Sequence, residues 1–193
     1  MNEDKKNRVC PVERAGVLDF TLRKLLQNPK RILRPYIKEG MTVLDLGCGP
    51  GFFTMALARL VGKAGKVIAA DLQEGMLAIV RKKIQNSAKA DIVKLHLCRP
   101  EGTGLSEKFD FILVFYILHE VPEPLLFLRE IKDLLKTGGK VLLVEPKFRV
   151  SRDEFLESIG IMKQAGFAVL AEPKIRFSRT VILRNANASE PGS

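Results

Sequence analysis

Short apolar runs alternate along this chain with longer segments in which apolar residues recur every three or four positions. The short runs are rich in β-branched and aromatic residues, which predicts buried strands. The longer segments have the period of amphipathic helices. This alternation predicts an α/β fold, a doubly wound and mostly parallel sheet with helices on both faces.

The expected strands are 41–46, 66–71, 91–97, 109–116, 140–145, 167–172 and 179–184. The expected helices are 52–62, 74–87, 122–136 and 151–166. Gly62 should end the first helix and the sequence TGG the third, while Ser151 and Glu154 predict a capping box at the start of the fourth. Only the short segment PKIRFS separates the last two strands, so these should be antiparallel.

The two ends of the chain depart from this alternation. Residues 1–40 have a helical pattern, including GVLDFTLRKLLQNP, and predict an N-terminal helical cap on the domain formed by residues 41–184. Residues 185–193 are small and polar, which predicts a disordered tail. Only PKFRV joins the fifth strand to the next helix, which is too short for a lid. Residues 1–40 must therefore cover the site, or the site stays open.

Length and composition indicate the class of protein and its cellular location. A chain of 193 residues suits one α/β domain, and its longest apolar run is too short to span a membrane. The polar N-terminus does not resemble a targeting peptide. These features predict a cytoplasmic protein without a membrane partner. The three cysteines, Cys10, Cys48 and Cys98, form no CxxC pair, which predicts reduced thiols in such a protein and no metal site.

The net charge of +10 is concentrated toward the two ends of the chain. Residues 1–40 carry ten basic and five acidic side chains, and residues 146–184 carry eight and four. An anionic substrate, a nucleic acid or a membrane surface could use such an excess, although a solvated surface is the commoner reason for scattered Lys and Arg.

A glycine-rich segment, VLDLGCGPGFFT, follows the first predicted strand. Its glycines are Gly47, Gly49 and Gly51, with the small Cys48 between the first two. A dinucleotide loop requires the spacing G-x-G-x-x-G, but here the third glycine comes one residue early and Phe52 takes its place. A P-loop is excluded because no Lys-Ser or Lys-Thr pair follows.

Two carboxylates end the first two strands and indicate which ligand this loop prefers. Asp45 would repel a pyrophosphate but attract the α-ammonium group of S-adenosylmethionine, which has no phosphate. Asp71 comes twenty residues after Gly51, where a carboxylate accepts hydrogen bonds from ribose hydroxyls. The alternative for Asp71 is a helix N-cap for the segment that starts at Glu74.

Four segments in order now carry a family resemblance. VLDLGCGPGFFT, VIAADLQEGML, FDFILVFYILHEVPEP and LLKTGGKVLLVEPK resemble motifs of the class I S-adenosylmethionine-dependent methyltransferases, in particular the small-molecule branch that includes quinone-biosynthesis enzymes. The resemblance covers residues 41–184. It implies a Rossmann-like sheet of seven strands whose last strand is antiparallel, and it implies S-adenosyl-L-methionine as the cofactor.

The resemblance also implies a set of cofactor contacts. Asp45 and the glycines at 47, 49 and 51 would hold the methionyl part, and Asp71 with Leu72 and Met76 would hold the adenosine. Family members often have an acidic residue near the adenine, whereas this chain has LCRPEG there. The candidates for the adenine contact are Cys98 and Arg99. Cys48 takes the small position in the glycine loop. Phe115 and Tyr116 are candidates for a wall of the cofactor or acceptor site.

Methyl transfer from a sulfonium requires alignment and exclusion of water, and a general base only for some acceptors. His119 follows the fourth strand and is the candidate base or acceptor ligand, against the alternative of packing at a helix start. His96 lies within the third strand, where a structural role is favoured. Phe115 and Tyr116 also have core packing as an alternative.

The acceptor is predicted to be a small molecule and to be anionic. Lys147, Arg149 and Arg152 follow the fifth strand and could attract it, helped by Arg8 and Arg14. RNA or protein as acceptor remains an alternative, as does a non-catalytic protein that binds S-adenosylmethionine. The stretch VFYI after the fourth strand disfavours methylation of DNA or exocyclic amines.

Overall fold

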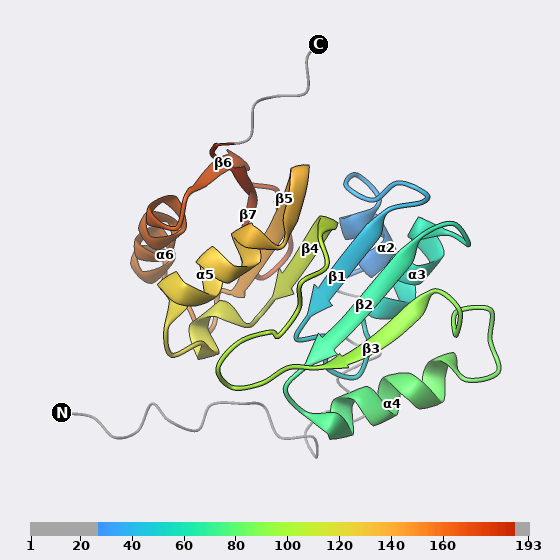
Figure 1. The fold of residues 1–193 in the computed structure, drawn as a ribbon. Helices are drawn as coiled ribbons and strands as arrows, with labels where there is room; N and C mark the ends of the chain where they lie inside the picture. The colour runs from blue at the N-terminus through green and yellow to red at the C-terminus, as the bar shows by residue number, and fades with distance from the viewer. Residues whose placement is uncertain (1–26, 188–193) are drawn as a thin grey trace, which may run out of the picture.

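The protein is described by a computed structural model, in which residues 27–187 are placed (Figure 1). One sheet of seven strands forms its centre, in the order β3-β2-β1-β4-β5-β7-β6. Strands β1 to β5 are parallel to one another, and β7 is antiparallel to both β5 and β6. The predicted doubly wound sheet with an antiparallel last strand is confirmed.

The strands are β1 Thr42–Leu46, β2 Lys66–Asp71, β3 Val93–Leu97, β4 Phe109–Phe115, β5 Leu135–Pro146, β6 Phe167–Ala171 and β7 Ser178–Asn185. The helices are α2 Pro29–Leu33, α3 Thr54–Val61, α4 Glu74–Ile84, α5 Pro124–Asp133 and α6 Arg152–Gln164, with a 3₁₀ turn, η3, at Leu118–Glu120. Each predicted strand and helix after residue 40 has an observed counterpart, with ends that differ by a few residues.

The helices lie in two layers, one on each face of the sheet (Figure 1). Because side chains alternate along a strand, Val43 of β1 faces the core beneath α2, α3 and α4, whereas Leu44 faces the core beneath α5 and α6. The neighbouring strands follow the same alternation, with Leu113 in the first core and Ile112 in the second. Both faces of the central strands are therefore buried, as the continuous apolar runs predicted.

The strand order places a topological switch point between β1 and β4. The chain moves outward from β1 to β2 and β3, and then returns to the other side of β1 to form β4. In the parallel pair, Leu46 at the end of β1 lies opposite Val114 near the end of β4. Open α/β sheets bind ligands at the carboxyl ends of strands beside such a point. The glycine loop and the segment after β4 therefore emerge side by side.

One boundary prediction is wrong. The glycines of TGG were expected to close the third helix, but α5 ends at Asp133 and β5 begins at Leu135 and runs through them. Leu135 pairs with Phe109, and the register then shifts through a bulge. A Cβ on Gly139 would lie 2.8 Å from the carbonyl oxygen of Phe109, so glycine permits this close approach of two backbones.

The other two signals predicted for helix ends are confirmed. Gly62 is the C-cap of α3, with a φ of 65°. At the start of α6 the Ser151 hydroxyl accepts a hydrogen bond from the Glu154 N–H, and the Glu154 carboxylate accepts one from the Ser151 N–H. Of the predicted helical cap at residues 1–40, only the part from residue 27 is described. The part of the predicted tail after residue 187 also lies outside the described residues.

Substitution at the centre of the sheet should be costly. Leu113 of β4 is fully buried, so Leu113→Ala should lower the free energy of unfolding by about 2–5 kcal/mol. Leu126→Ala is the control, because Leu126 is 60% exposed and should change the value by less than about 0.5 kcal/mol. Urea denaturation measures both, and equal effects would contradict the assigned core.

Candidate functional site

The glycine loop after β1 has three residues in the left-handed region. Gly47, Gly49 and Gly51 have φ values of 66°, 52° and 81°, which residues other than glycine rarely adopt. A Cβ on Gly47 would lie 1.8 Å from the Cδ1 atom of Ile117, so this glycine allows the segment after β4 to pack against the loop. A Cβ on Gly49 would meet open space. The loop therefore presents bare backbone at Gly49.

Asp71 connects this loop to the next one along the sheet. One of its carboxylate oxygens accepts a hydrogen bond from the Gly49 N–H at 2.8 Å, and the other accepts one from the Gln73 N–H at 2.9 Å. Gln73 is the N-cap of α4, so Asp71 lies before the helix and is not its cap. Burial raises the pKa of the Asp71 carboxyl, against the lowering effect of the backbone N–H groups of Gln73, Gly49 and Leu72. An ionised carboxylate has about four acceptor positions, which leaves capacity for further donors.

Asp45 lies deeper than the sequence suggests. Its side chain is 3% exposed, and one oxygen accepts a hydrogen bond of 2.6 Å from the hydroxyl of Thr54, the first residue of α3. Asp45 therefore joins the end of β1 to the start of α3 beneath the glycine loop. Thr54 was not among the predicted residues, although its position directly after VLDLGCGPGFF placed it at the helix start.

The residues predicted to contact adenosine lie at the ends of β2 and β3. Leu72 is exposed directly after Asp71, whereas Met76 is buried in the first turns of α4. The Cys98 N–H donates to the Asp71 carbonyl oxygen at 2.9 Å, which holds the end of β3 beside β2. Arg99 is exposed.

The thiols in this region are neutral. Burial raises the pKa of the Cys98 thiol to about 12, and it raises that of Cys48 further, assisted by Asp45 and Asp71. The Cys48 side chain is buried under the loop, where its small size fits. A buried thiol with a raised pKa is a poor nucleophile, so neither cysteine is a candidate for nucleophilic chemistry.

An aromatic group lies at the end of β4. The Phe115 ring contacts Phe53 at 4.3 Å and Tyr116 at 4.4 Å between ring centroids. Tyr116 has a φ of 66°, a strained conformation for a residue with a side chain. Its hydroxyl lies 2.8 Å from the Gln27 amide and 2.7 Å from the Ser178 hydroxyl, contacts that hold the ring in place.

His119 lies in η3 beside two carboxylates. Its Nδ1 atom is 2.5 Å from Oε2 of Glu145, and its Nε2 atom is 3.8 Å from Oε1 of Glu120. Glu145 is 1% exposed, and its Oε1 atom accepts a hydrogen bond from the Leu118 N–H at 2.9 Å. Sequence reasoning gave Glu145 no role. The available signal was that it ends a buried strand, as Asp45 and Asp71 do.

His96 has a local contact instead. Its Nε2 atom lies 2.6 Å from the Thr103 carbonyl oxygen. Thr103 in turn donates from its N–H, at 2.7 Å, and from its hydroxyl to Glu130 of α5. This chain of contacts holds the segment after β3, which agrees with the structural role favoured for His96.

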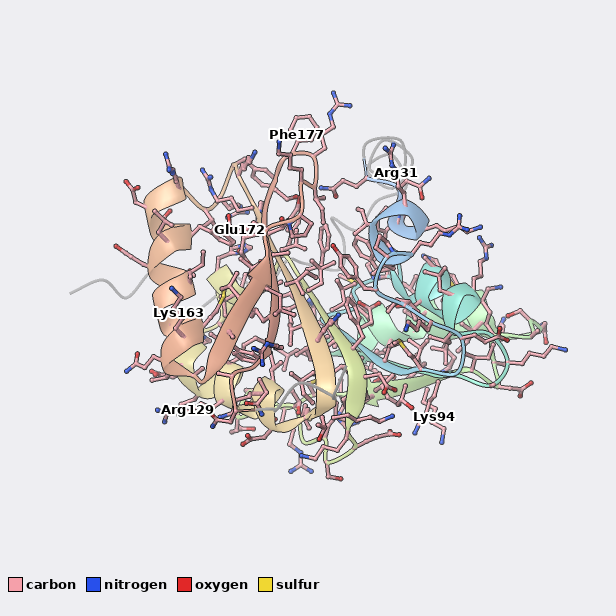
Figure 2. The ribbon with its side chains drawn as sticks, turned by 90° about the horizontal axis from the view of Figure 1, so that it is seen from above. Arg31, Lys94, Arg129, Lys163, Glu172 and Phe177 are labelled. Atoms are coloured by element: carbon pink, nitrogen blue, oxygen red, sulfur yellow. The ribbon has the colours of Figure 1, made fainter. Side chains whose placement is uncertain are left out.

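Basic residues and two phenylalanines surround the connections after β5 and before β7. Lys147, Phe148 and Arg149 are exposed, as are Arg176 and Phe177, and the Lys147 N–H donates to the Phe177 carbonyl oxygen at 3.0 Å. The Phe148 ring lies 6.4 Å from that of Tyr116. Figure 2 shows Phe177 projecting at the same edge of the molecule as Arg31 of α2.

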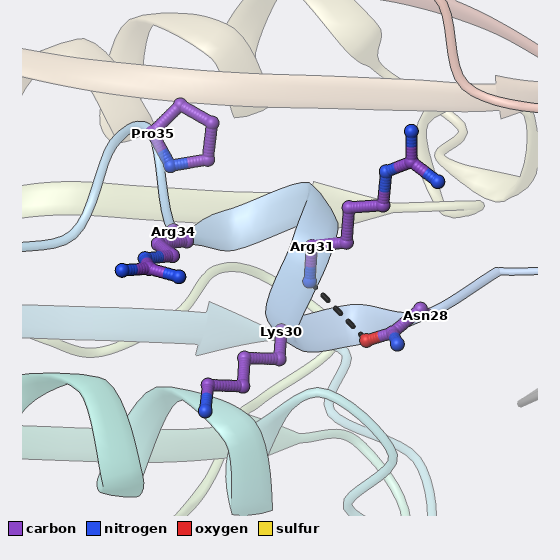
Figure 3. A pocket seen from close by; sticks show the side chains of 5 residues that line it. All are labelled: Asn28, Lys30, Arg31, Arg34 and Pro35. Carbon is purple, nitrogen blue, oxygen red and sulfur yellow. Dashed lines mark hydrogen bonds between the residues drawn. The ribbon is translucent and has the colours of Figure 1, made fainter.

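A hollow of about 440 Å³ lies at α2 (Figure 3). It is lined by Asn28, Lys30, Arg31, Arg34 and Pro35. Asn28 caps the helix through a hydrogen bond from the Arg31 N–H. All of the lining comes from one short segment, and the residues predicted to bind the cofactor do not line it. The convergence of β1, β2 and β4 is therefore the better candidate site.

Between residues 27 and 187, no three His, Cys, Asp or Glu side chains are grouped so that they could hold a metal ion. Within the same residues, no helix combines the length and the apolar character needed to cross a membrane.

Comparison with known proteins identifies the relatives of this chain. Residues 37–169 match the family model described as a methyltransferase domain. A demethylmenaquinone methyltransferase of Bacillus velezensis is 35% identical over 154 residues, which are 75% of this chain and 66% of that protein. The enzyme of the same name from Lactococcus lactis is 38% identical over 109 residues, 55% of this chain and 42% of that protein. The matched part of the chain thus spans 66% and 42% of the length of these two curated relatives.

A solved structure resembles the whole fold. A SAM-dependent methyltransferase from Aquifex aeolicus superposes with a TM-score of 0.80 and is 28% identical, over 91% of this chain and 98% of that one.

The carboxyl group of Glu120 makes the stability of the protein depend on pH. Burial raises the pKa of Glu120, against the lowering effect of His119 and Arg149, so the folded state binds this proton more tightly than the unfolded state. Ionisation therefore destabilises the fold at neutral pH and has no effect below pH about 4, where both states are protonated. Glu120→Gln should raise the melting temperature at pH 7, and this gain should disappear near pH 4.

The matched control is Glu123→Gln, because Glu123 is exposed on the segment that follows. Scanning calorimetry at several pH values measures both variants. A lower melting temperature for Glu120→Gln at neutral pH, or a gain that persists in acid, would contradict the buried environment of this carboxyl group.

Proposed function

Since the chain belongs to the family of class I S-adenosylmethionine-dependent methyltransferases, we propose that it transfers a methyl group to a small acceptor of the quinone type. S-adenosylmethionine is the methyl donor of this family. The observation that carries the proposal is the junction of β1, β2 and β4, where a bare glycine loop and the Asp71 carboxylate adjoin the aromatic end of β4.

The residues at this junction fit S-adenosylmethionine. The open space at Gly49 accepts a ligand against the backbone, and the remaining acceptor positions of Asp71 suit two ribose hydroxyls. Asp45 supplies negative charge beneath the methionyl side of the loop and thus favours an ammonium group over a phosphate. Leu72 and Met76 would flank the adenosine, and Cys98 and Arg99 would lie next to it.

The remaining residues of the site align the acceptor. Bound S-adenosylmethionine supplies an activated methyl group on a good leaving group, so the protein contributes orientation and exclusion of water. Phe115 is buried in the core and supports Tyr116, and the rings of Tyr116 and Phe148 provide flat apolar surface suited to an aromatic ring. The exposed side chains of Lys147 and Arg149 attract a negatively charged acceptor.

The quinone-type acceptor rests on the names of the curated relatives, both demethylmenaquinone methyltransferases. The aromatic end of β4 supports it independently. We propose a cytoplasmic reaction, as the reduced thiols predict, and a helical cap formed by residues 1–40. Gln27 supports such a cap, because its amide donates to the Arg176 carbonyl oxygen at 3.0 Å beside the site.

Binding of the cofactor can be tested at Gly49. Gly49→Ala should weaken binding of S-adenosylmethionine at least tenfold, because its Cβ enters the space assigned to the ligand. Gly40→Ala is the matched control, since Gly40 also has a positive φ and open space around it but lies before β1. Both variants should lose about 1 kcal/mol of stability from backbone strain.

Isothermal titration calorimetry with S-adenosylmethionine and S-adenosylhomocysteine measures the affinities. Tight binding to the wild-type protein and to Gly40→Ala, but not to Gly49→Ala, is the expected result. Binding of NADH in place of both nucleosides, or equal affinities for the two variants, would contradict the assigned site.

Recognition of an anionic acceptor can be tested at the connection after β5. Replacing Lys147 and Arg149 by Ala should raise the KM for the acceptor severalfold at low salt, and less at high salt, because exposed charges are screened. The control pair, Arg129→Ala and Lys163→Ala, removes two exposed charges from α5 and α6, far from Phe177 in Figure 2.

The assay follows S-adenosylhomocysteine release with a hydroquinone that carries a carboxylate group. The neutral 1,4-dihydroxynaphthalene serves as the comparison acceptor, and its KM should not change. Kinetics of the Lys147 and Arg149 variant that equal those of the wild-type protein at low salt would remove the electrostatic part of the proposal.

A further inference from the structure

We propose that buried Glu145 is a positioning residue, which holds His119 in the tautomer with a proton on Nδ1 and a free lone pair on Nε2, so that His119 can accept a proton from a hydroxyl-bearing acceptor. This inference rests on the proposed methyl transfer and names the proton chemistry of the same site. It concerns the side of the site formed by β4, η3 and β5.

The contacts of Glu145 fix its orientation. Its Oε1 atom accepts a hydrogen bond from the Leu118 N–H at 2.9 Å, and its Oε2 atom lies 2.5 Å from Nδ1 of His119. Both contacts are made by one carboxylate that is 1% exposed. Because a carboxylate only accepts hydrogen bonds, Nδ1 must be the donor. A neutral imidazole then carries its lone pair on Nε2.

Charged groups from several elements lie around His119 and the neighbouring Glu120. Glu145 lies at the end of β5, and Glu120 of η3 has an oxygen 3.8 Å from Nε2. Arg149, after β5, and Asp71, at the end of β2, are near enough to influence the pKa of Glu120. The imidazole ring of His119 therefore has a carboxylate beside each nitrogen, Glu145 at Nδ1 and Glu120 at Nε2.

Proton transfer to His119 accompanies the transfer of the methyl group. The acceptor hydroxyl gives its proton to Nε2 of His119, and the electron pair left on the acceptor oxygen forms the new O–C bond to the methyl carbon of S-adenosylmethionine. The bond between sulfur and that carbon breaks, its pair remains on sulfur, and S-adenosylhomocysteine leaves as a neutral thioether. The imidazolium later returns its proton to water. A phenol or hydroquinone, in keeping with the quinone-type acceptor proposed above, has the hydroxyl group that this step requires.

An isosteric substitution tests the positioning role. Glu145→Gln keeps the shape but offers one oxygen and one NH₂ group. The Leu118 N–H requires the oxygen, so the NH₂ group faces Nδ1, which must then become the acceptor. His119 is expected to switch to the tautomer with the proton on Nε2. A comparable change of tautomer lowers kcat about 10⁴-fold in a serine-protease triad.

The direct measurement is ¹⁵N NMR of the two histidines, with His119→Gln used to assign the signals. In the wild-type protein above the titration range, Nδ1 should be pyrrole-like and Nε2 pyridine-like, and Glu145→Gln should exchange these shifts. Glu120→Gln is the comparison variant, which removes a nearby charge and should keep the wild-type tautomer. A wild-type spectrum with the proton on Nε2, or one unchanged by Glu145→Gln, would overturn the inference.

The wild-type spectrum tests the tautomer of His119 even if Glu145→Gln does not fold.

Calorimetry separates this inference from the proposed function. Wild-type protein that fails to bind S-adenosylmethionine contradicts the methyltransferase assignment, whereas normal binding with the wrong tautomer contradicts only the role of Glu145. With 1,4-dihydroxynaphthalene, kcat of Glu145→Gln should fall at least a hundredfold while KM changes less than about threefold. Equal kcat values would also overturn the inference.

Discussion

The Asp71 carboxylate is the constraint on which the site depends. Its two oxygens each accept a backbone N–H, one from Gly49 and one from Gln73, so a single side chain joins the glycine loop to the start of α4. Burying a charged carboxylate costs free energy, and these N–H donors partly offset that cost. The fold thus maintains a desolvated negative charge beside bare backbone, an arrangement suited to ribose hydroxyls.

The site illustrates how a doubly wound sheet places acidic side chains. Asp45, Asp71 and Glu145 each lie at the carboxyl end of a parallel strand, and each is buried. In every case a hydroxyl or a backbone N–H donates to the carboxylate. The three carboxylates nevertheless have different surroundings, because Asp45 lies beneath the loop, Asp71 at its outer side and Glu145 behind His119. Cofactor binding and proton transfer can therefore be separated along one edge of the sheet.

Much of the fold could be predicted from the sequence because its determinants are local. Alternating apolar runs set the strands, and Ser151 with Glu154 set a helix start, since these signals act within a few residues. The segment around Gly139 was misassigned because its glycines serve a contact with a distant strand. The local sequence pattern does not reveal that the backbone at Gly139 approaches Phe109. Paired glycines in that pattern instead indicate the end of a helix.

The sequence likewise predicts which residues belong to the candidate site but not their contacts. Its glycines and Asp71 have a recognisable spacing, but the partners of His119 come from a strand 26 residues away. The left-handed conformation of Tyr116 depends likewise on contacts with Gln27 and Ser178. Strand order brings such residues together, so a list of candidates in the sequence cannot give their contacts.

A crystal structure with S-adenosylhomocysteine tests the central claim most directly. The account predicts that both ribose hydroxyls donate to Asp71, that the backbone of Gly49 lies against the ligand and that the amino group faces the Asp45 side of the loop. A nucleoside bound elsewhere, such as at α2, or ribose hydroxyls without contact to Asp71, would contradict it.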